Sequence, residues 1–139
     1  MEHLTLSDTL EIHIEKAFKI ISSIELYPKF VPGYKDVNLL EKKDDYIKAV
    51  IVPSIPIKNI VMEAKLTFPE KISFTQIEGP VDIFKGEWQL HEINYNSTKI
   101  DFQLEYYVKK FLIRQLVYKF IKVSFKDIIS SFKIMAKRV

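Results

Sequence analysis

The chain has 139 residues, with 21 Lys or Arg, 18 Asp or Glu and a formal net charge of +3. This length favours one domain, and so small a net charge does not by itself indicate a nucleic-acid partner. The sequence holds no cysteine, which excludes disulfides, thiolate metal ligands and a Cys nucleophile. Its start, MEHLTLSD, lacks an apolar signal segment, and no apolar run reaches the roughly 18 residues of a membrane span. We therefore expect a cytoplasmic protein, at most peripheral to a membrane.

The N-terminal quarter predicts one strand and two short helices. Apolar residues alternate over roughly residues 2–12, which indicates an extended segment. The next stretch, IEKAFKIISSIELYPKF, has helical spacing from about Glu15 to Ser23. Pro28 and Pro32 then allow one further helical turn, at Leu26 to Val31, and Gly33 ends it.

The middle of the chain predicts an antiparallel meander of about six strands. Between Val37 and Val108, apolar and polar residues alternate in segments that are separated by short polar or Pro- and Gly-containing turns. These turns lie at residues 42–45, 53–56, 69–70, 79–80 and 94–98. Because such short connections can join only antiparallel neighbours, we expect an antiparallel sheet. The alternation gives this sheet one apolar face.

The last stretch predicts one continuous helix over residues 111–138. It reads FLIRQLVYKFIKVSFKDIISSFKIMAKRV and contains neither Pro nor Gly. Its apolar residues recur at spacings of three, four and seven, which is typical of a helix with one buried stripe. Ser124 and Ser131 interrupt that stripe. Each serine either bonds back to the preceding turn or thins the helix so that another segment fits against it.

Together these elements predict an α+β fold. Each strand has one apolar face and the terminal helix has one apolar stripe, so both are buried if a curved sheet wraps around the helix. We expect about six or seven antiparallel strands, two short helices after the first strand, and a single domain over residues 1–139.

Positive charge is concentrated in the terminal helix. From Lys109 onward there are nine basic residues and one acidic residue, whereas the rest of the chain has 12 basic and 17 acidic residues. Five lysines share the outer side of the helix: Lys119, Lys122, Lys126, Lys133 and Lys137. This face is either simply solvated or docks on an anionic partner, for which a membrane surface and ribosomal or other RNA are the alternatives.

No residue pattern indicates catalysis, a cofactor or a metal site. His3, His13 and His91 lack metal-ligand spacing and are expected to be exposed. An enzyme would need a general acid or base inside the fold. Four residues could serve by position, but none has a visible partner: Gln76, Glu78, Tyr106 and Tyr118.

The inward face of the sheet is rich in large aromatic residues, which predicts an elongated, mostly apolar cavity between sheet and helix. Gln76 shares this face and could be one of its few polar groups. The expected ligand-binding residues are Met62, Phe68, Phe74, Gln76, Phe84, Trp88, Phe102, Tyr106, Val117, Ile121, Ser124 and Ile128.

Two segments resemble the coenzyme Q-binding START and polyketide cyclase/dehydrase families. The first has Glu25, Tyr27-Pro28, Phe30 and Val31-Pro32 after a short helix. The second, IEGPVDIFKGEWQL, matches the family's Gly-Pro and Gly-x-Trp pattern at Gly79-Pro80, Gly86 and Trp88. With the terminal helix, the resemblance covers almost the whole chain.

The resemblance implies a helix-grip fold, START-like, whose cavity takes hydrophobic ligands such as quinones, lipids or polyketides. The same family includes a bacterial toxin-like member that acts on ribosome assembly. Val81 and Leu90 stand where the family usually has aromatic residues, so we expect a reshaped cavity mouth.

Three functions follow as hypotheses. The leading one is binding, transport or chaperoning of an isoprenoid quinone or a lipid without catalysis. The alternatives are a polyketide cyclase-like enzyme and a toxin-like factor that contacts the ribosome or RNA through the basic helix face.

Overall fold

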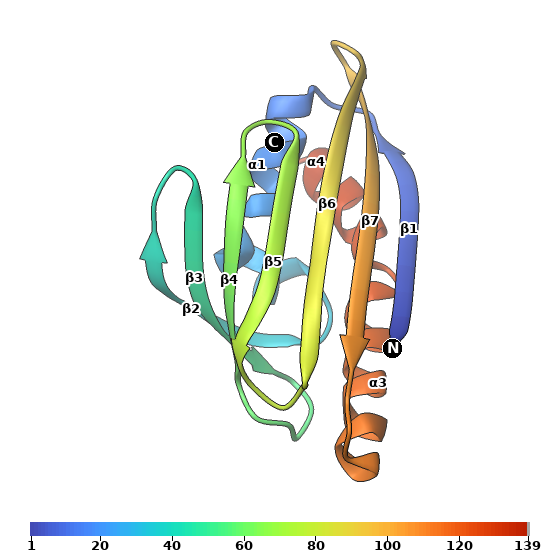
Figure 1. The fold of residues 1–139 in the computed structure, drawn as a ribbon. Coiled ribbons are helices and arrows are strands. Elements are labelled where there is room, and N and C mark those ends of the chain that lie inside the picture. The colour runs from blue at the N-terminus through green and yellow to red at the C-terminus, as the bar shows by residue number, and fades with distance from the viewer. Residues whose placement is uncertain (139) are drawn as a thin grey trace.

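The computed structural model describes residues 1–138 as a seven-stranded sheet with helices against one face (Figure 1). The strands are β1 (Glu2–Leu10), β2 (Tyr34–Lys42), β3 (Tyr46–Pro53), β4 (Ile60–Thr67), β5 (Lys71–Glu78), β6 (Ile83–Asn94) and β7 (Ser97–Tyr107). The helices are α1 (Ile14–Ser22), the 3-10 turn η1 (Ile24–Leu26), α2 (Tyr27–Phe30), α3 (Phe111–Phe125) and α4 (Ile128–Ala136).

The sheet is antiparallel throughout, in the order β1-β7-β6-β5-β4-β3-β2. Strands β2 to β7 are neighbours in chain order, as short turns require. Strand β1 instead pairs with β7, with Leu6 opposite Phe102. The chain between β1 and β2 must therefore cross from one edge of the sheet to the other, and α1, η1 and α2 make that crossing.

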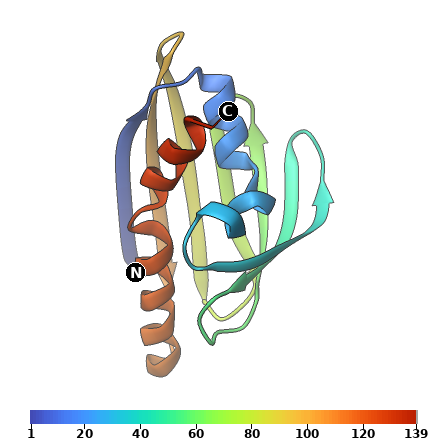
Figure 2. The same ribbon diagram turned by 180° about the vertical axis from the view of Figure 1, so that it is seen from behind.

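All helices lie against the same face of the sheet, as the view from behind shows (Figure 2). Side chains alternate accordingly along β3, where Ile47, Ala49 and Ile51 are buried and the residues between them are more exposed. The expected α+β architecture, a curved antiparallel sheet that grips a long C-terminal helical segment, is confirmed.

An aromatic cluster holds the C-terminal helices on the sheet. The ring centroids of Trp88 and Phe102 are 4.3 Å apart, and Phe102 stacks on Phe125 of α3 at 5.2 Å. Trp88 also meets Phe132 of α4 edge-on at 5.4 Å. Such pairs add about 0.5–1.5 kcal/mol each beyond their apolar burial, so this cluster fixes α3 and α4 on β6 and β7.

The prediction of one continuous terminal helix is wrong at residues 126–127. Helix α3 ends at Phe125 and α4 begins at Ile128, because Asp127 leaves the helical region with φ −119° and ψ 20°. The Ser131 hydroxyl and amide both donate to the carbonyl oxygen of Asp127, at 3.1 and 3.0 Å. Serine back-bonding of this kind bends helices. The apolar stripe nevertheless continues across the bend through Ile128 and Phe132.

The two serines of the stripe take the two roles that the sequence left open. Ser131 bonds back to the preceding turn. Ser124 instead makes room: it is fully buried, and its Oγ has no hydrogen-bond partner among the described residues. Gly33, with a φ of +93°, lies directly against it, and a Cβ at Gly33 would overlap the Ser124 Oγ.

Candidate ligand-binding cavity

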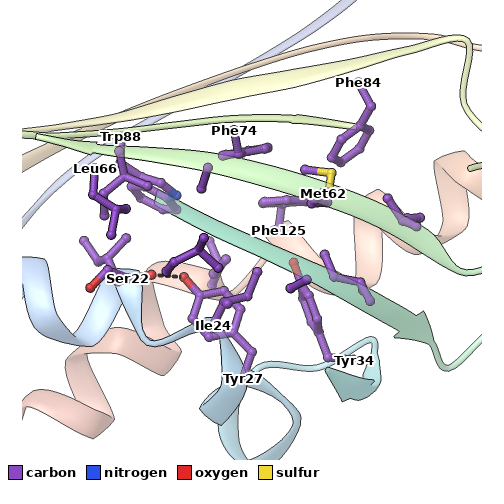
Figure 3. Close-up of a pocket in the computed structure, with 18 of the residues that line it drawn as sticks. Ser22, Ile24, Tyr27, Tyr34, Met62, Leu66, Phe74, Phe84, Trp88 and Phe125 are labelled. Atoms are coloured by element: carbon purple, nitrogen blue, oxygen red, sulfur yellow. Dashed lines mark hydrogen bonds between the residues drawn. The ribbon is translucent and has the colours of Figure 1, made fainter. Parts of the chain in front are cut away.

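A narrow apolar cavity lies against the inner face of β2 to β6 (Figure 3). Residues of α1, η1 and α2 cover it, and Phe120, Phe125 and Ile128 of α3 and α4 close one side. The cavity volume is about 60 Å³, so the free space is narrow. The shape suits a slim or flat hydrophobic molecule.

Small residues create part of this space. Ala49 of β3 stands opposite Met62, and Ala64 of β4 stands opposite Phe74. Gly86 is the partner of Phe74 on the other side, and a Cβ there would overlap the Phe74 ring. The ring therefore lies over a position without a side chain, so it takes up less of the space above the sheet.

Five of the sequence-predicted site residues line the cavity together. They come from the strands β4, β5 and β6 and from the start of α4: Met62, Phe74, Phe84, Trp88 and Ile128. Alternation on the inner face of the sheet identified the four strand residues, and the helical spacing of the apolar stripe identified Ile128.

Two of the expected lining residues belong to other surroundings. Phe68 is 58% exposed and packs edge-on against Phe18 of α1. The Gln76 amide donates to the carbonyl oxygen of Val81 and accepts from the Val81 amide, so it fixes the turn between β5 and β6. Both residues follow the period of their strand, but they lie near strand ends, where the chain leaves the cavity.

The remaining five expected lining residues belong to the contact between the sheet and α3. Phe102 is packed between Trp88 and Phe125, and Tyr106 lies edge-on to Tyr118 at 5.9 Å. The other three are buried on α3 outside the cavity lining: Val117, Ile121 and Ser124. Side chains of α3 and β7 fill the space there.

The N-terminal helical segment and β3 also contribute to the lining, which the sequence did not predict. Ile21, Ile24 and Tyr27 reach the cavity from α1, η1 and α2, and Tyr34 reaches it from the start of β2. The spacing of Tyr27 and Tyr34 around a Pro- and Gly-containing turn was the available signal. Ile47, Ala49 and Ile51 of β3 also line the cavity; their alternation indicates an inward face but does not separate cavity lining from packed core.

The lining contains no charged side chain and four with polar atoms: Ser22, Tyr27, Tyr34 and Trp88. Two hydroxyls are already engaged, because Tyr27 donates to the Ile21 carbonyl at 2.5 Å and Ser22 donates to the Lys19 carbonyl at 3.4 Å. Burial raises the pKa of Tyr27 and Tyr34 well above that of a free tyrosine, so both hydroxyls stay protonated.

The four positions considered for acid–base chemistry lie outside the cavity lining. Gln76 is held by Val81, Glu78 is exposed, and the Tyr118 hydroxyl donates to Glu2 at 3.1 Å. Val81 and Leu90 are buried but do not line the cavity, which corrects the expectation that they reshape its mouth.

His13 departs from its expected exposure. Its ring stacks on Tyr95 at 4.3 Å and hydrogen-bonds the Tyr95 carbonyl at 2.9 Å, which leaves 18% of its side chain exposed. Glu15 lies 3.2 Å from its second ring nitrogen. Within residues 1–138 no three His, Asp or Glu side chains gather as metal ligands would.

The five lysines of the terminal helices are exposed. Lys133 is engaged: its ammonium lies 3.0 Å from the carboxylate of Asp8 on β1. The Thr9 amide and then Lys133 lower the pKa of that carboxyl. Over the described part of the chain, no helix combines the length and apolarity needed to cross a bilayer.

A family model described as "Polyketide cyclase / dehydrase and lipid transport" matches residues 10–133. Among curated proteins, the ribosome association toxin RatA of Escherichia coli strain K12 is 23% identical over 127 residues, covering 90% of this chain and 80% of RatA. RatA of Vibrio cholerae strain O395 is 22% identical and covers all of this chain and 98% of its own.

Solved structures share the fold at low sequence identity. The Zhui aromatase/cyclase from a Streptomyces species has a TM-score of 0.86 at 14% identity, covering 99% of this chain and 94% of its own. A START superfamily protein from Mycobacterium smegmatis has a TM-score of 0.76 at 15% identity, covering 98% and 97%.

Proposed function

Because the chain belongs to the polyketide cyclase / dehydrase and lipid transport family, we propose that it binds and carries an isoprenoid quinone or a lipid without chemically altering it. The observation that carries this proposal is the lining of the cavity, which combines aliphatic and aromatic side chains with no charged group. Transfer of apolar surface from water into such a lining contributes about 25 cal/mol per Å².

The same lining argues against the cyclase alternative. Cyclisation of a polyketide needs proton transfer at the reacting carbon atoms, which requires a positioned acid or base. The cavity offers only hydroxyls and an indole, and burial raises the pKa of both tyrosines, so neither serves as a base near neutral pH. We therefore propose a carrier in preference to an enzyme.

Filling the cavity tests the proposal. Ala49→Leu adds a large side chain to the floor of the cavity, whereas Ala136→Leu makes the same change at the end of α4, outside it. We expect Ala49→Leu to lower the affinity for the neutral probe N-phenyl-1-naphthylamine at least about 10-fold by steric exclusion, at nearly unchanged secondary structure. Ala136→Leu should bind like the parent.

Extraction of the freshly purified protein with organic solvent, followed by mass spectrometry, should recover a hydrophobic molecule from the parent and less of it from Ala49→Leu. Equal probe binding by the parent and Ala49→Leu would place the binding site elsewhere and contradict the proposal.

A carrier must also collect its ligand, and we propose that it does so at an anionic membrane surface. The positive charges belong to Lys119, Lys122, Lys126, Lys133 and Lys137, all exposed. Each lysine near such a surface contributes about 1 kcal/mol. The name of the RatA relatives suggests the ribosome as the competing anionic partner.

A further inference from the structure

Two hydrogen-bond donors in the cavity remain without a partner. Neither the Tyr34 hydroxyl nor the indole N–H of Trp88 bonds to any atom of residues 1–138, although both residues are at least nine-tenths buried. Within residues 1–138, two side-chain polar atoms are both sealed from solvent and without a hydrogen-bond partner: Glu25 Oε2 and Ser124 Oγ. Neither donor of the cavity is among them. Tyr34 Oη and Trp88 Nε1 therefore face open space, which is the cavity.

The surrounding packing fixes both donors. The Tyr34 ring lies edge-on to Tyr27 at 5.4 Å and beside Phe120 at 5.9 Å. The Trp88 indole is held by Phe102 at 4.3 Å and Phe132 at 5.4 Å. Figure 3 shows the oxygen of Tyr34 and the nitrogen of Trp88 turned inward, toward other lining side chains, from different parts of the cavity.

An unpaired donor in an apolar cavity has lost its water partners and is costly until an acceptor replaces them. We infer that Tyr34 and Trp88 are the polar anchors of the site, and that its ligand is an uncharged hydrophobic molecule with hydrogen-bond-accepting oxygens, such as a quinone, ketone or ester. This inference rests on the proposed function and narrows it.

The absence of charged side chains from the lining restricts the class of ligand further. An ionised fatty acid or phosphate would enter without a cationic partner, because the lining has no Lys, Arg or His. Burial of an unpaired anion is far more costly than burial of a neutral carbonyl. A pure hydrocarbon would fill the space but leave both donors unpaired, so it should bind more weakly than its oxygenated counterpart.

A matched pair of probes tests the role of the donors by isothermal titration calorimetry. Menadione and 2-methylnaphthalene share one carbon skeleton, but only menadione carries two carbonyl oxygens. We expect the parent to prefer menadione, and Tyr34→Phe to lower its affinity about 2- to 10-fold, the loss of one hydrogen bond. Affinity for 2-methylnaphthalene should stay unchanged, because the ring is retained.

Two further variants separate anchoring from packing. Tyr27→Phe removes a hydroxyl from the same lining, but one that already donates to the Ile21 carbonyl. It should lower stability and leave the preference for menadione intact. Trp88→Phe should lower that preference as Tyr34→Phe does, whatever its effect on overall packing. At pH 8, methyl decanoate should bind and the decanoate anion should not.

The outcomes distinguish this inference from the proposed function. If the parent binds both naphthalene probes equally, or if neither Tyr34→Phe nor Trp88→Phe changes the preference, the anchoring role is wrong while apolar binding stands. Tight binding of decanoate would overturn the restriction to uncharged ligands. Failure of all four probes to bind would overturn the carrier proposal itself.

Discussion

At the scale of single residues, the contact between Gly33 and Ser124 decides how the chain enters the sheet. Gly33 has a φ of +93°, a backbone conformation that glycine adopts without strain and other residues disfavour. It sits against a buried serine whose hydroxyl has no partner within residues 1–138. The serine is therefore present for its small size, because a larger side chain would collide with the turn before β2.

The first prediction follows from this contact. Gly33→Ala should lower the free energy of unfolding by about 1–3 kcal/mol, through backbone strain and overlap with the Ser124 hydroxyl. Ser124→Ala should leave it unchanged or raise it by up to about 1 kcal/mol, because no hydrogen bond is lost. The combined variant should be less destabilised than Gly33→Ala alone, since the overlap with the hydroxyl is gone, while the strain and a close approach to the Cβ of residue 124 remain.

Urea unfolding followed by circular dichroism measures all three variants as a double-mutant cycle. Strictly additive changes in the free energy of unfolding would show that the two residues do not interact. Ser124→Leu should be severely destabilising, because its larger side chain would collide with the backbone at Gly33.

At the scale of elements, the sequence predicted strands well because each strand's period depends on its own alternating residues. The pairing of β1 with β7 brings together residues nearly a hundred positions apart, and no local pattern encodes it. The interruption at residues 126–127 was missed for a related reason. The apolar spacing of three and four continues across it, and the bend appears only in the backbone of Asp127, which leaves the helical region.

The break between α3 and α4 predicts faster hydrogen exchange at the start of α4. The first amides of α4, at residues 128–130, make no backbone hydrogen bond to the carbonyls of residues 124–126 that a continuous helix would supply. We expect these amides to exchange at least about 10-fold faster than those of residues 117–125, as measured by NMR in deuterated buffer. The amide of Ser131, bonded to Asp127 at 3.0 Å, should be protected again. Uniform protection from residue 117 to 132 would contradict the break and show one continuous helix instead.

At the scale of the whole molecule, the cavity lies under α1, η1 and α2, beside the contact between the sheet and α3 where the sequence predicted it. Alternation identifies which residues face inward, and this is why Met62, Phe74, Phe84 and Trp88 were found. It does not say which inward residues pack on the helix and which face empty space. That distinction depends on where α1 and α2 cross the sheet, and hence on the pairing of β1 at the far edge.

The final prediction concerns the basic outer side of the molecule. Lys119, Lys122 and Lys126 lie on one side of α3 and its end and are exposed, whereas Lys133 is occupied by Asp8. Replacement of these three by Gln should weaken binding to liposomes that contain anionic lipid about 100-fold, at about 1 kcal/mol per lysine. Binding by the parent should fall as salt rises, because screening shortens the reach of each charge.

The control replaces Lys35, Lys65 and Lys99, exposed residues of the sheet, and makes the same change in net charge. Cosedimentation with liposomes and, separately, with ribosomes measures both partners. If both triple variants bind liposomes like the parent, the helix lysines are only a solvated face, and salt-sensitive binding to ribosomes alone would assign them to RNA instead.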